Sequence, residues 1–211
     1  MAVNYQKLMD TELAGITADA PPPKLLLHAC CAPCSSYVLE YTAKFFDITV
    51  LFYNPNIMPA EEYYKRLGEM EKLLTAAEYP NPVKLVPDRY DPAEFIAAAS
   101  GFESEPEGGA RCGKCFELRL CRTAELAAEG GFDYFATTLT VSPHKNAEEI
   151  NTVGARLGEQ YGVRWLPSDF KKRGGYQRSI VLSREYGLYR QNYCGCPYAQ
   201  NTSGETGTQV V

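Results

Sequence analysis

Short apolar runs alternate with longer stretches of helical character along this chain. Five runs of four to six residues predict strands, at residues 24–28, 48–53, 83–86, 132–136 and 163–166. Helices are expected around them, over residues 4–16, 35–46, 59–78, 92–99, 116–129, 147–161 and 176–186. Strands that alternate with helices in this way form parallel βαβ units. The pattern therefore predicts an α/β fold, a parallel sheet with flanking helices.

The loops that follow these strands are the expected place for a functional site. In open parallel sheets, ligands bind outside the carboxyl ends of the strands. Polar and cysteine-rich segments stand at those positions, at residues 28–36, 54–59, 87–92, 137–145 and 167–175. We expect these segments to meet at one edge of the sheet.

Composition narrows the class of protein. The 211 residues are 45% hydrophobic and 22% charged, and no apolar run approaches the ~20 residues that cross a bilayer. We expect one α/β catalytic domain over residues 1–200, a disordered tail over residues 201–211, and no membrane partner. Residues 1–20 lack the pattern of a secretory signal, so a cytoplasmic location is expected. The net charge of -5 argues against a generally basic nucleic-acid binder.

Seven of the eight cysteines fall in three tight groups. These groups are Cys30, Cys31 and Cys34, then Cys112 and Cys115, and finally Cys194 and Cys196. In a reducing compartment, such clusters indicate metal binding or redox chemistry, not a disulfide scaffold. Two single residues, Cys121 within an expected helix and His28 at the end of the first strand, are interpreted as structural.

The spacing of the first two groups suits a metal centre. A Cys-x2-Cys pair such as Cys112 and Cys115 can bind one zinc ion or two corners of an iron–sulfur cluster. The adjacent Cys30 and Cys31 are awkward for tetrahedral zinc, whose paired ligands normally stand two to four residues apart. A larger cubane accommodates neighbouring ligands better. The spacing favours an iron–sulfur cluster and leaves structural zinc as the alternative.

Cys194 and Cys196 enclose a single glycine. A disulfide across one residue closes a small, strained ring, and strain favours redox cycling over a permanent bond. The alternative is that the two thiols complete the ligand set of the metal centre. The residues alone support both interpretations equally.

Two further segments could contact a polyanion. Ser142 is expected to cap a helix with Pro143 at its first position, so that His144 and Lys145 could receive a phosphate. Residues 164–190 hold seven Lys or Arg against two acids, with tyrosines among them. Cations interleaved with aromatic rings suit RNA. The basic candidates for substrate contact are Lys171, Lys172, Arg173 and Arg178.

Together, these motifs resemble the QueH family of epoxyqueuosine reductases. The resemblance runs from about Asn4 to about Ala199, and it rests on LLLHACCAPCSS, FYNPNI with the following PAEEYYKR, RCGKCFELR, TTLTVSPHKN, FKKRGGYQRSI and YRQNYCGCPYA. The double cysteine together with both later pairs is much more specific than any single CxxC. The resemblance implies an adenine-nucleotide alpha hydrolase-like (HUP-like) domain, in which CCAPC stands where relatives hold a Gly-rich phosphate loop.

The resemblance also implies cofactors and a reaction. It implies a [4Fe-4S] cluster with four cysteine ligands, Cys30, Cys31, Cys112 and Cys115, and a redox-active pair, Cys194 and Cys196. Cys34 is the candidate ligand of a second metal ion, iron or zinc. The implied activity is the two-electron reduction of epoxyqueuosine in tRNA to queuosine, the last step of queuosine biosynthesis, with electrons from an unidentified donor. A PP-loop-type tRNA sulfur transferase and a zinc-stabilised RNA-binding module are the alternatives.

Overall fold

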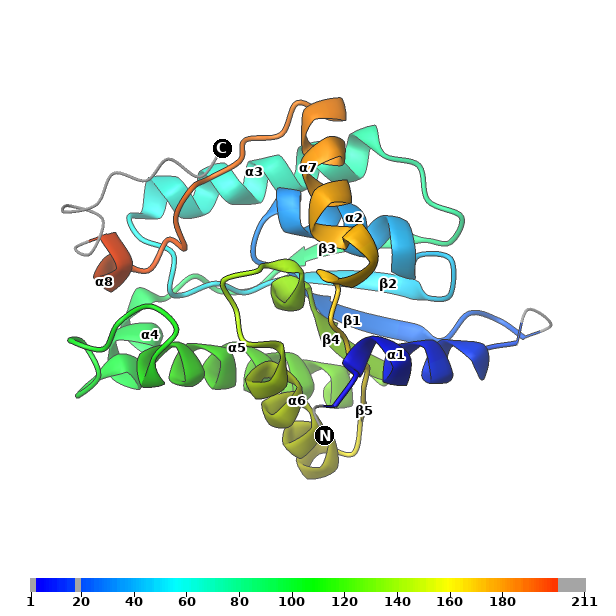
Figure 1. Cartoon of the computed structure of the whole chain (residues 1–211), viewed down its shortest axis with the longest axis horizontal. Helices are drawn as coiled ribbons and strands as arrows, with labels where there is room; N and C mark the ends of the chain where they lie inside the picture. Colours follow the sequence, from blue (N-terminus) through cyan, green and yellow to red (C-terminus); the bar gives the residue numbers. More distant parts are fainter. Residues whose placement is uncertain (1–2, 18–19, 201–211) are drawn as a thin grey trace.

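A five-stranded parallel sheet forms the centre of the protein (Figure 1). The computed structural model describes residues 3–17 and 20–200, so the tail expected at residues 201–211 lies outside the described residues. The strands are β1 (Lys24–His28), β2 (Asp47–Phe52), β3 (Val83–Pro87), β4 (Tyr134–Thr137) and β5 (Arg164–Trp165). They pair in the order β3-β2-β1-β4-β5, and every pairing is parallel. The predicted α/β architecture is confirmed.

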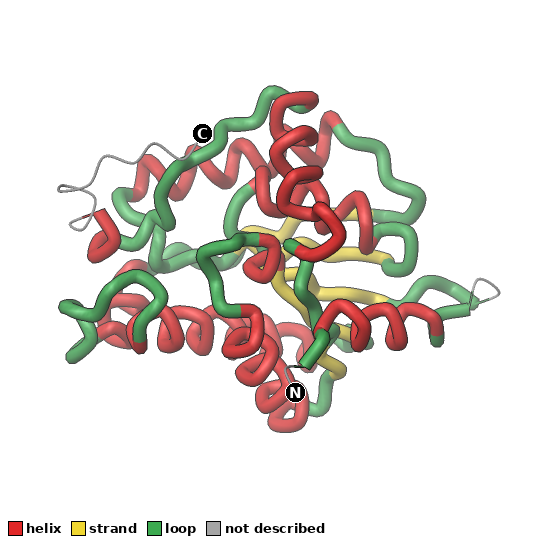
Figure 2. Tube along the Cα trace, in the orientation of Figure 1, coloured by secondary structure: helices red, strands yellow, loops and turns green. Residues whose placement is uncertain are grey.

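Helices cover both faces of the sheet (Figure 2). They are α1 (Tyr5–Ala14), α2 (Ala32–Thr42), α3 (Ala60–Ala76), α4 (Pro92–Ala99), α5 (Ala110–Glu129), α6 (Ala147–Tyr161), α7 (Gly175–Glu185) and the short α8 (Pro197–Gln200). Two 3-10 turns, η1 (Thr138–Val141) and η2 (Lys172–Gly174), follow β4 and β5 along the chain. Helix α2 packs against α3 and α7 on one face, whereas α5 packs against α4 and α6 on the other.

The central strand β1 explains why the sequence shows a continuous apolar run. Leu25 and Leu27 are buried in the core beneath α2 and α3, and Leu26 is buried in the core beneath α5 and α6. Since successive side chains of a strand point to opposite faces, a strand covered by helices on both sides has to be apolar throughout. Among the described residues, no helix is long and apolar enough to cross a membrane.

Two helices begin well before the residues that the sequence pattern predicts, and one predicted cap is wrong. Helix α2 begins at Ala32 instead of residue 35, because Pro33 fits the first helical turn. Helix α5 begins at Ala110 instead of residue 116, so the second cysteine pair lies on a helix and not in a loop. The predicted cap of α6 at Ser142 is wrong: Asn146 caps the helix by accepting hydrogen bonds from the backbone N–H groups of residues 148 and 149.

The order of the strands fixes the position of the main crevice. The chain runs outward from β1 to β2 and β3, and later returns to the other side of β1 with β4 and β5. Connections at the carboxyl ends of β1 and β4 therefore depart in opposite directions, which opens a crevice at this switch point. The cysteine-rich segment after His28 and the turn η1 after Thr137 both lie there.

Candidate active site

The first cysteine group forms a compact triad at the switch point. The sulfur atoms of Cys30, Cys31 and Cys34 all lie within 4.8 Å of one another, and those of Cys30 and Cys31 are 3.8 Å apart. Cys31 is the N-cap residue of α2 and has an extended backbone, with φ −170°. Among the residues that the structure describes, this is the one group of three or more potential metal-ligand atoms at such distances.

The triad concentrates negative charge on one sulfur. Hydrogen bonds with Cys31 and Cys34 hold the pKa of Cys30 well below its ordinary value. The hydrogen bond with Cys30 raises the pKa of Cys31 to about 12, and the same interaction raises the pKa of Cys34 well above its ordinary value. The two neighbouring thiols thus favour loss of the proton at Cys30. A metal ion bound here would displace the thiol protons of the triad, because cysteine binds metals as the thiolate.

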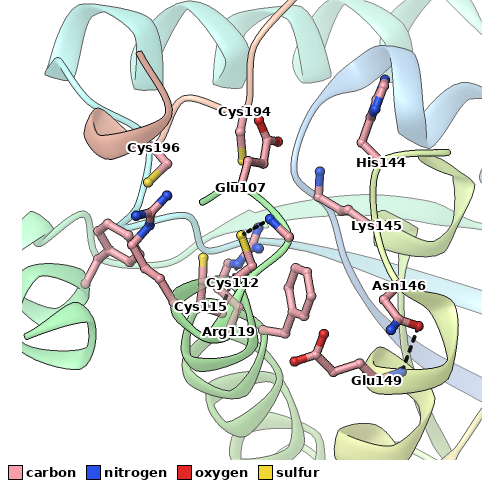
Figure 3. Close-up of a pocket in the computed structure, with 14 residues that line it drawn as sticks. Glu107, Cys112, Cys115, Arg119, His144, Lys145, Asn146, Glu149, Cys194 and Cys196 are labelled. Carbon is pink, nitrogen blue, oxygen red and sulfur yellow. Dashed lines mark hydrogen bonds between the residues drawn. The ribbon is translucent and has the colours of Figure 1, made fainter. Parts of the chain in front are cut away.

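The other two cysteine groups line one pocket beside the triad (Figure 3). Cys112 and Cys115 approach it from the first turns of α5, and Cys194 and Cys196 approach it from the C-terminal segment. Cys115 and Cys196 are buried, whereas Cys112 and Cys194 are partly exposed. The structure therefore brings all seven clustered cysteines to one edge of the sheet, in a triad and a four-cysteine pocket.

Two cationic side chains, Arg119 and Lys145, line the same pocket as these cysteines. Arg119 is only 2% exposed, donates from Nε to the carbonyl oxygen of Cys115 over 3.2 Å, and has an Nη2 without a hydrogen-bond partner. Burial lowers the pKa of Arg119, but the nearby thiols, Cys115 first, outweigh burial and raise it. For Lys145, too, burial lowers the pKa, but the charges of Cys194 and the triad raise it overall. The sequence indicated Lys145 but gave no reason to select Arg119.

The C-terminal segment is held on α3 by buried charge. Residues 187–196, which we call the strap, cross α3 and carry the third cysteine group (Figure 1). Arg66 on α3 donates to the carbonyl oxygens of Tyr193 and Cys194, and its Nε pairs with Glu62 over 2.7 Å. Sequence reasoning missed both α3 residues. Their i,i+4 spacing marks an ion pair, but no sequence pattern shows that the pair is buried.

The basic residues predicted to contact substrate have different surroundings. His144 is exposed and lines the pocket together with Lys145. Three of the four candidates after β5 are already paired with carboxylates, as Lys171 with Asp169 at 2.7 Å, Arg173 with Asp10 at 2.6 Å, and Arg178 with Glu40 at 2.5 Å. Lys172 is exposed and has no carboxylate partner among the described residues.

His28 and Cys121, which the sequence analysis interpreted as structural, both pack in or against the core. His28 is fully buried, with Nδ1 2.9 Å from the Thr137 hydroxyl and Nε2 3.1 Å from the Tyr53 carbonyl oxygen. Burial lowers its pKa to about 3, so the ring is neutral and joins β1 to its neighbours. Cys121 packs in the core beneath α5, with its sulfur 3.3 Å from the Tyr161 hydroxyl.

Comparisons with known proteins agree on one family. The family model described as epoxyqueuosine reductase QueH matches residues 25–202. Epoxyqueuosine reductase QueH of Streptococcus pyogenes is 45% identical over 210 residues, which cover 99% of this chain and 82% of that protein. Epoxyqueuosine reductase QueH of Thermotoga maritima is 38% identical over 178 residues, which cover 83% of this chain and 89% of that protein.

A solved structure supports the fold. The U34-tRNA thiolase NcsA from Methanococcus maripaludis, with its [4Fe-4S] cluster, superposes with a TM-score of 0.51. The match covers 91% of this chain and 67% of that chain at 12% sequence identity. At this identity the likeness shows a shared HUP-like fold and nothing about the reaction.

Proposed function

Because the chain belongs to the epoxyqueuosine reductase QueH family, we propose that it reduces epoxyqueuosine in tRNA to queuosine. The observation that carries this proposal is the meeting of three cysteine groups at the switch point of the sheet. Converting an epoxide to an alkene removes one oxygen as water and consumes two electrons and two protons. A site that performs this reaction needs electron carriers and a proton source, and the cysteines can supply both.

The residues present fit an anionic iron–sulfur cluster. Thiolates are the usual ligands of such clusters, and we assign Cys30, Cys31, Cys112 and Cys115 to a [4Fe-4S] cluster. The unpaired, buried Nη2 of Arg119 supports this assignment, since a buried cation requires a negative partner. When bound, the cluster would supply one-electron transfer next to the substrate.

Cys34 is proposed as the ligand of a second metal ion, iron or zinc. Its sulfur lies within 4.8 Å of both other sulfurs of the triad, so an ion bound by Cys34 would lie beside the cluster ligands. A Lewis-acidic ion at this position would weaken the C–O bond of an epoxide.

Cys194 and Cys196 are proposed as the source of the electron pair. Two thiols that become a disulfide release two electrons and two protons, which balance the conversion of the epoxide to the alkene and water. An external reductant then has to restore the dithiol, and its identity is open. Both sulfurs line the same pocket as Cys112 and Cys115, which keeps the proposed electron carriers together.

The tRNA is expected to approach along the basic side of this edge. His144 and Lys145 line the pocket, and they are proposed to contact substrate together with the residues after β5, Lys171, Lys172, Arg173 and Arg178. The chain has a net charge of -5, so local cations have to hold the polyanion. Of the alternatives, a PP-loop sulfur transferase is disfavoured because residues 29–34 (ACCAPC) contain no glycine. A zinc-stabilised module would need no redox pair.

One preparation tests both the cofactor and the reaction. Protein purified without oxygen should contain iron and sulfide, show cluster-type visible absorption and convert epoxyqueuosine in tRNA when a chemical reductant is supplied. Replacing any one of the four proposed cluster ligands by serine should remove the absorption. Replacing Cys194 or Cys196 should retain the iron and abolish turnover. An active wild type without iron contradicts the cluster, and loss of iron from a Cys194 variant contradicts the redox pair.

A further inference from the structure

Arg66 is a buried guanidinium whose hydrogen bonds end on the strap. Arg66 is 2% exposed and lies on α3, a helix that carries none of the cysteines. Nη1 donates to the carbonyl oxygen of Cys194 over 3.0 Å, and Nη2 donates to that of Tyr193 over 3.4 Å. The third nitrogen, Nε, is held by Glu62. The planar fork of arginine places donors on three separate nitrogens and so reaches all three acceptors at once, whereas lysine carries its donors on a single nitrogen.

The same guanidinium lies directly against the glycine between the two cysteines. Gly195 has φ +94°, and a Cβ built there would lie 3.2 Å from both Nη atoms of Arg66. The carbonyl oxygen of Gly195 accepts a hydrogen bond from the backbone N–H of Met58 over 3.0 Å. Three successive carbonyl oxygens of the turn are thus fixed from outside, and two of them are fixed by one side chain.

The turn is fixed in the conformation in which both cysteines are free thiols. A disulfide across one residue brings two sulfurs to about 2.05 Å within a small ring, so its geometry depends directly on the backbone around Gly195. Hydrogen bonds to a buried, ion-paired guanidinium resist any change of that backbone, because breaking them leaves charge unsatisfied.

We propose that Arg66 is a positioning residue that holds the Cys194–Cys196 turn in its dithiol conformation and so makes the disulfide formed during turnover easy to reduce again. This inference rests on the proposed redox role of the two cysteines. The equilibrium concerned is the exchange of the dithiol with glutathione disulfide, which gives the protein disulfide and two molecules of glutathione. Two S–H bonds and one S–S bond are consumed, and the same number are formed.

The strap offers a matched control on the same helix. Lys72 on α3 donates to the carbonyl oxygen of Gly187, and Glu69 accepts from the backbone N–H of Tyr189 over 2.7 Å. These contacts also attach the strap to α3, but they do not touch the turn that carries the cysteines. A variant of Lys72 therefore separates general loosening of the strap from the specific effect of Arg66.

The test measures the dithiol–disulfide equilibrium of the cluster-containing protein without oxygen and without tRNA. Wild type, the double variant Glu62→Gln with Arg66→Gln, Arg66→Lys and Lys72→Gln are equilibrated with graded ratios of glutathione to its disulfide. Free thiols at positions 194 and 196 are then alkylated and counted by mass spectrometry. The double variant avoids leaving a buried carboxylate unpaired.

We expect the double variant to shift the equilibrium at least tenfold toward the disulfide, which corresponds to about 30 mV for this two-electron couple. Arg66→Lys should shift it in the same direction by less, and Lys72→Gln should stay within twofold of wild type. A double variant within twofold of wild type overturns the inference, as does an equal shift in Lys72→Gln. If the double variant does not fold, an unshifted Arg66→Lys overturns it. A wild type that forms no Cys194–Cys196 disulfide at any ratio overturns the proposed redox pair as well.

Discussion

The three basic residues around η2 differ in how freely they can bind a phosphate. Lys171 lies 2.7 Å from Asp169 and Arg173 lies 2.6 Å from Asp10, so each would have to leave a carboxylate before it could contact RNA. Lys172 is exposed and has no such partner in the described part of the chain. We therefore expect Lys172→Ala to weaken tRNA binding with a marked salt dependence, and Lys171→Ala or Arg173→Ala to change the salt dependence less.

The size of the effect follows from counterion release. Each phosphate neutralised by a protein cation contributes about −0.7 to −0.9 to the slope of log affinity against log salt concentration. Loss of one contact should flatten the slope by that amount. Between 50 and 200 mM salt, one contact corresponds to about a threefold change in affinity. Lys172→Ala should thus weaken binding about threefold more at the lower salt concentration than at the higher.

Binding of epoxyqueuosine-containing tRNA, measured by fluorescence anisotropy across a potassium chloride titration, checks this prediction. Lys44 provides the control, because it is exposed and follows the end of α2, at the opposite edge of the sheet from the cysteines. Lys44→Ala should leave the slope unchanged. If Lys172→Ala keeps the wild-type slope while Lys171→Ala or Arg173→Ala flattens it, the reasoning from the ion pairs is refuted.

Three more predictions concern the metal centre and the core. Cys34→Ser should keep the cluster-type absorption but lose any additional bound metal, whereas Cys121→Ser should keep both. Metal and sulfide analysis of the two variants checks this prediction. Loss of the absorption in Cys34→Ser would make Cys34 a cluster ligand. Arg119→Met should move the midpoint potential of the cluster to more negative values, because a buried positive charge favours the reduced state. A redox titration followed by visible absorption measures the potential. An unchanged potential would show that the charge of Arg119 does not act on the cluster. Gly154→Ala should lower the free energy of unfolding by about 1–3 kcal/mol, because its Cβ would overlap the ring of Trp165. Gly68→Ala, with open space around it, should stabilise α3 by about 0.5–1 kcal/mol, and thermal unfolding compares the two variants.

The periodicity of the sequence was sufficient for the five strands, for the longer helices and for the parallel sheet, but not for the order of the strands. The strand predicted at residues 24–28 and the helix predicted at 147–161 have the observed bounds, because both have clear apolar periods and clear ends. The rule that parallel strands gather their carboxyl-end loops at one edge also correctly predicted that the first cysteine group and the turn after Thr137 meet.

Helix starts and buried charge could not be predicted in the same way. Helix α5 begins before residue 116 because Arg111 turns back and donates to the carbonyl oxygens of residues 102, 103 and 105, which closes the preceding loop. No local sequence pattern predicts the contact between Arg111 and the preceding loop. The pairing of Arg66 with the strap joins residues more than a hundred positions apart, so only the folded chain reveals it.

The position of the cysteines at helix starts explains how this edge can hold so much negative charge. Cys31 is the N-cap of α2, although its side chain makes no capping hydrogen bond to the helix. Cys112 lies in the first turn of α5, where its sulfur accepts from the backbone N–H of Gly108 over 3.2 Å. The N-terminal end of a helix carries a partial positive charge, which stabilises an anion bound there. A phosphate-binding loop uses the same helix end with glycines that let a ligand approach the backbone. Here the proposed ligands of a metal centre instead lie at the helix starts themselves, where the same partial positive charge can stabilise their thiolates.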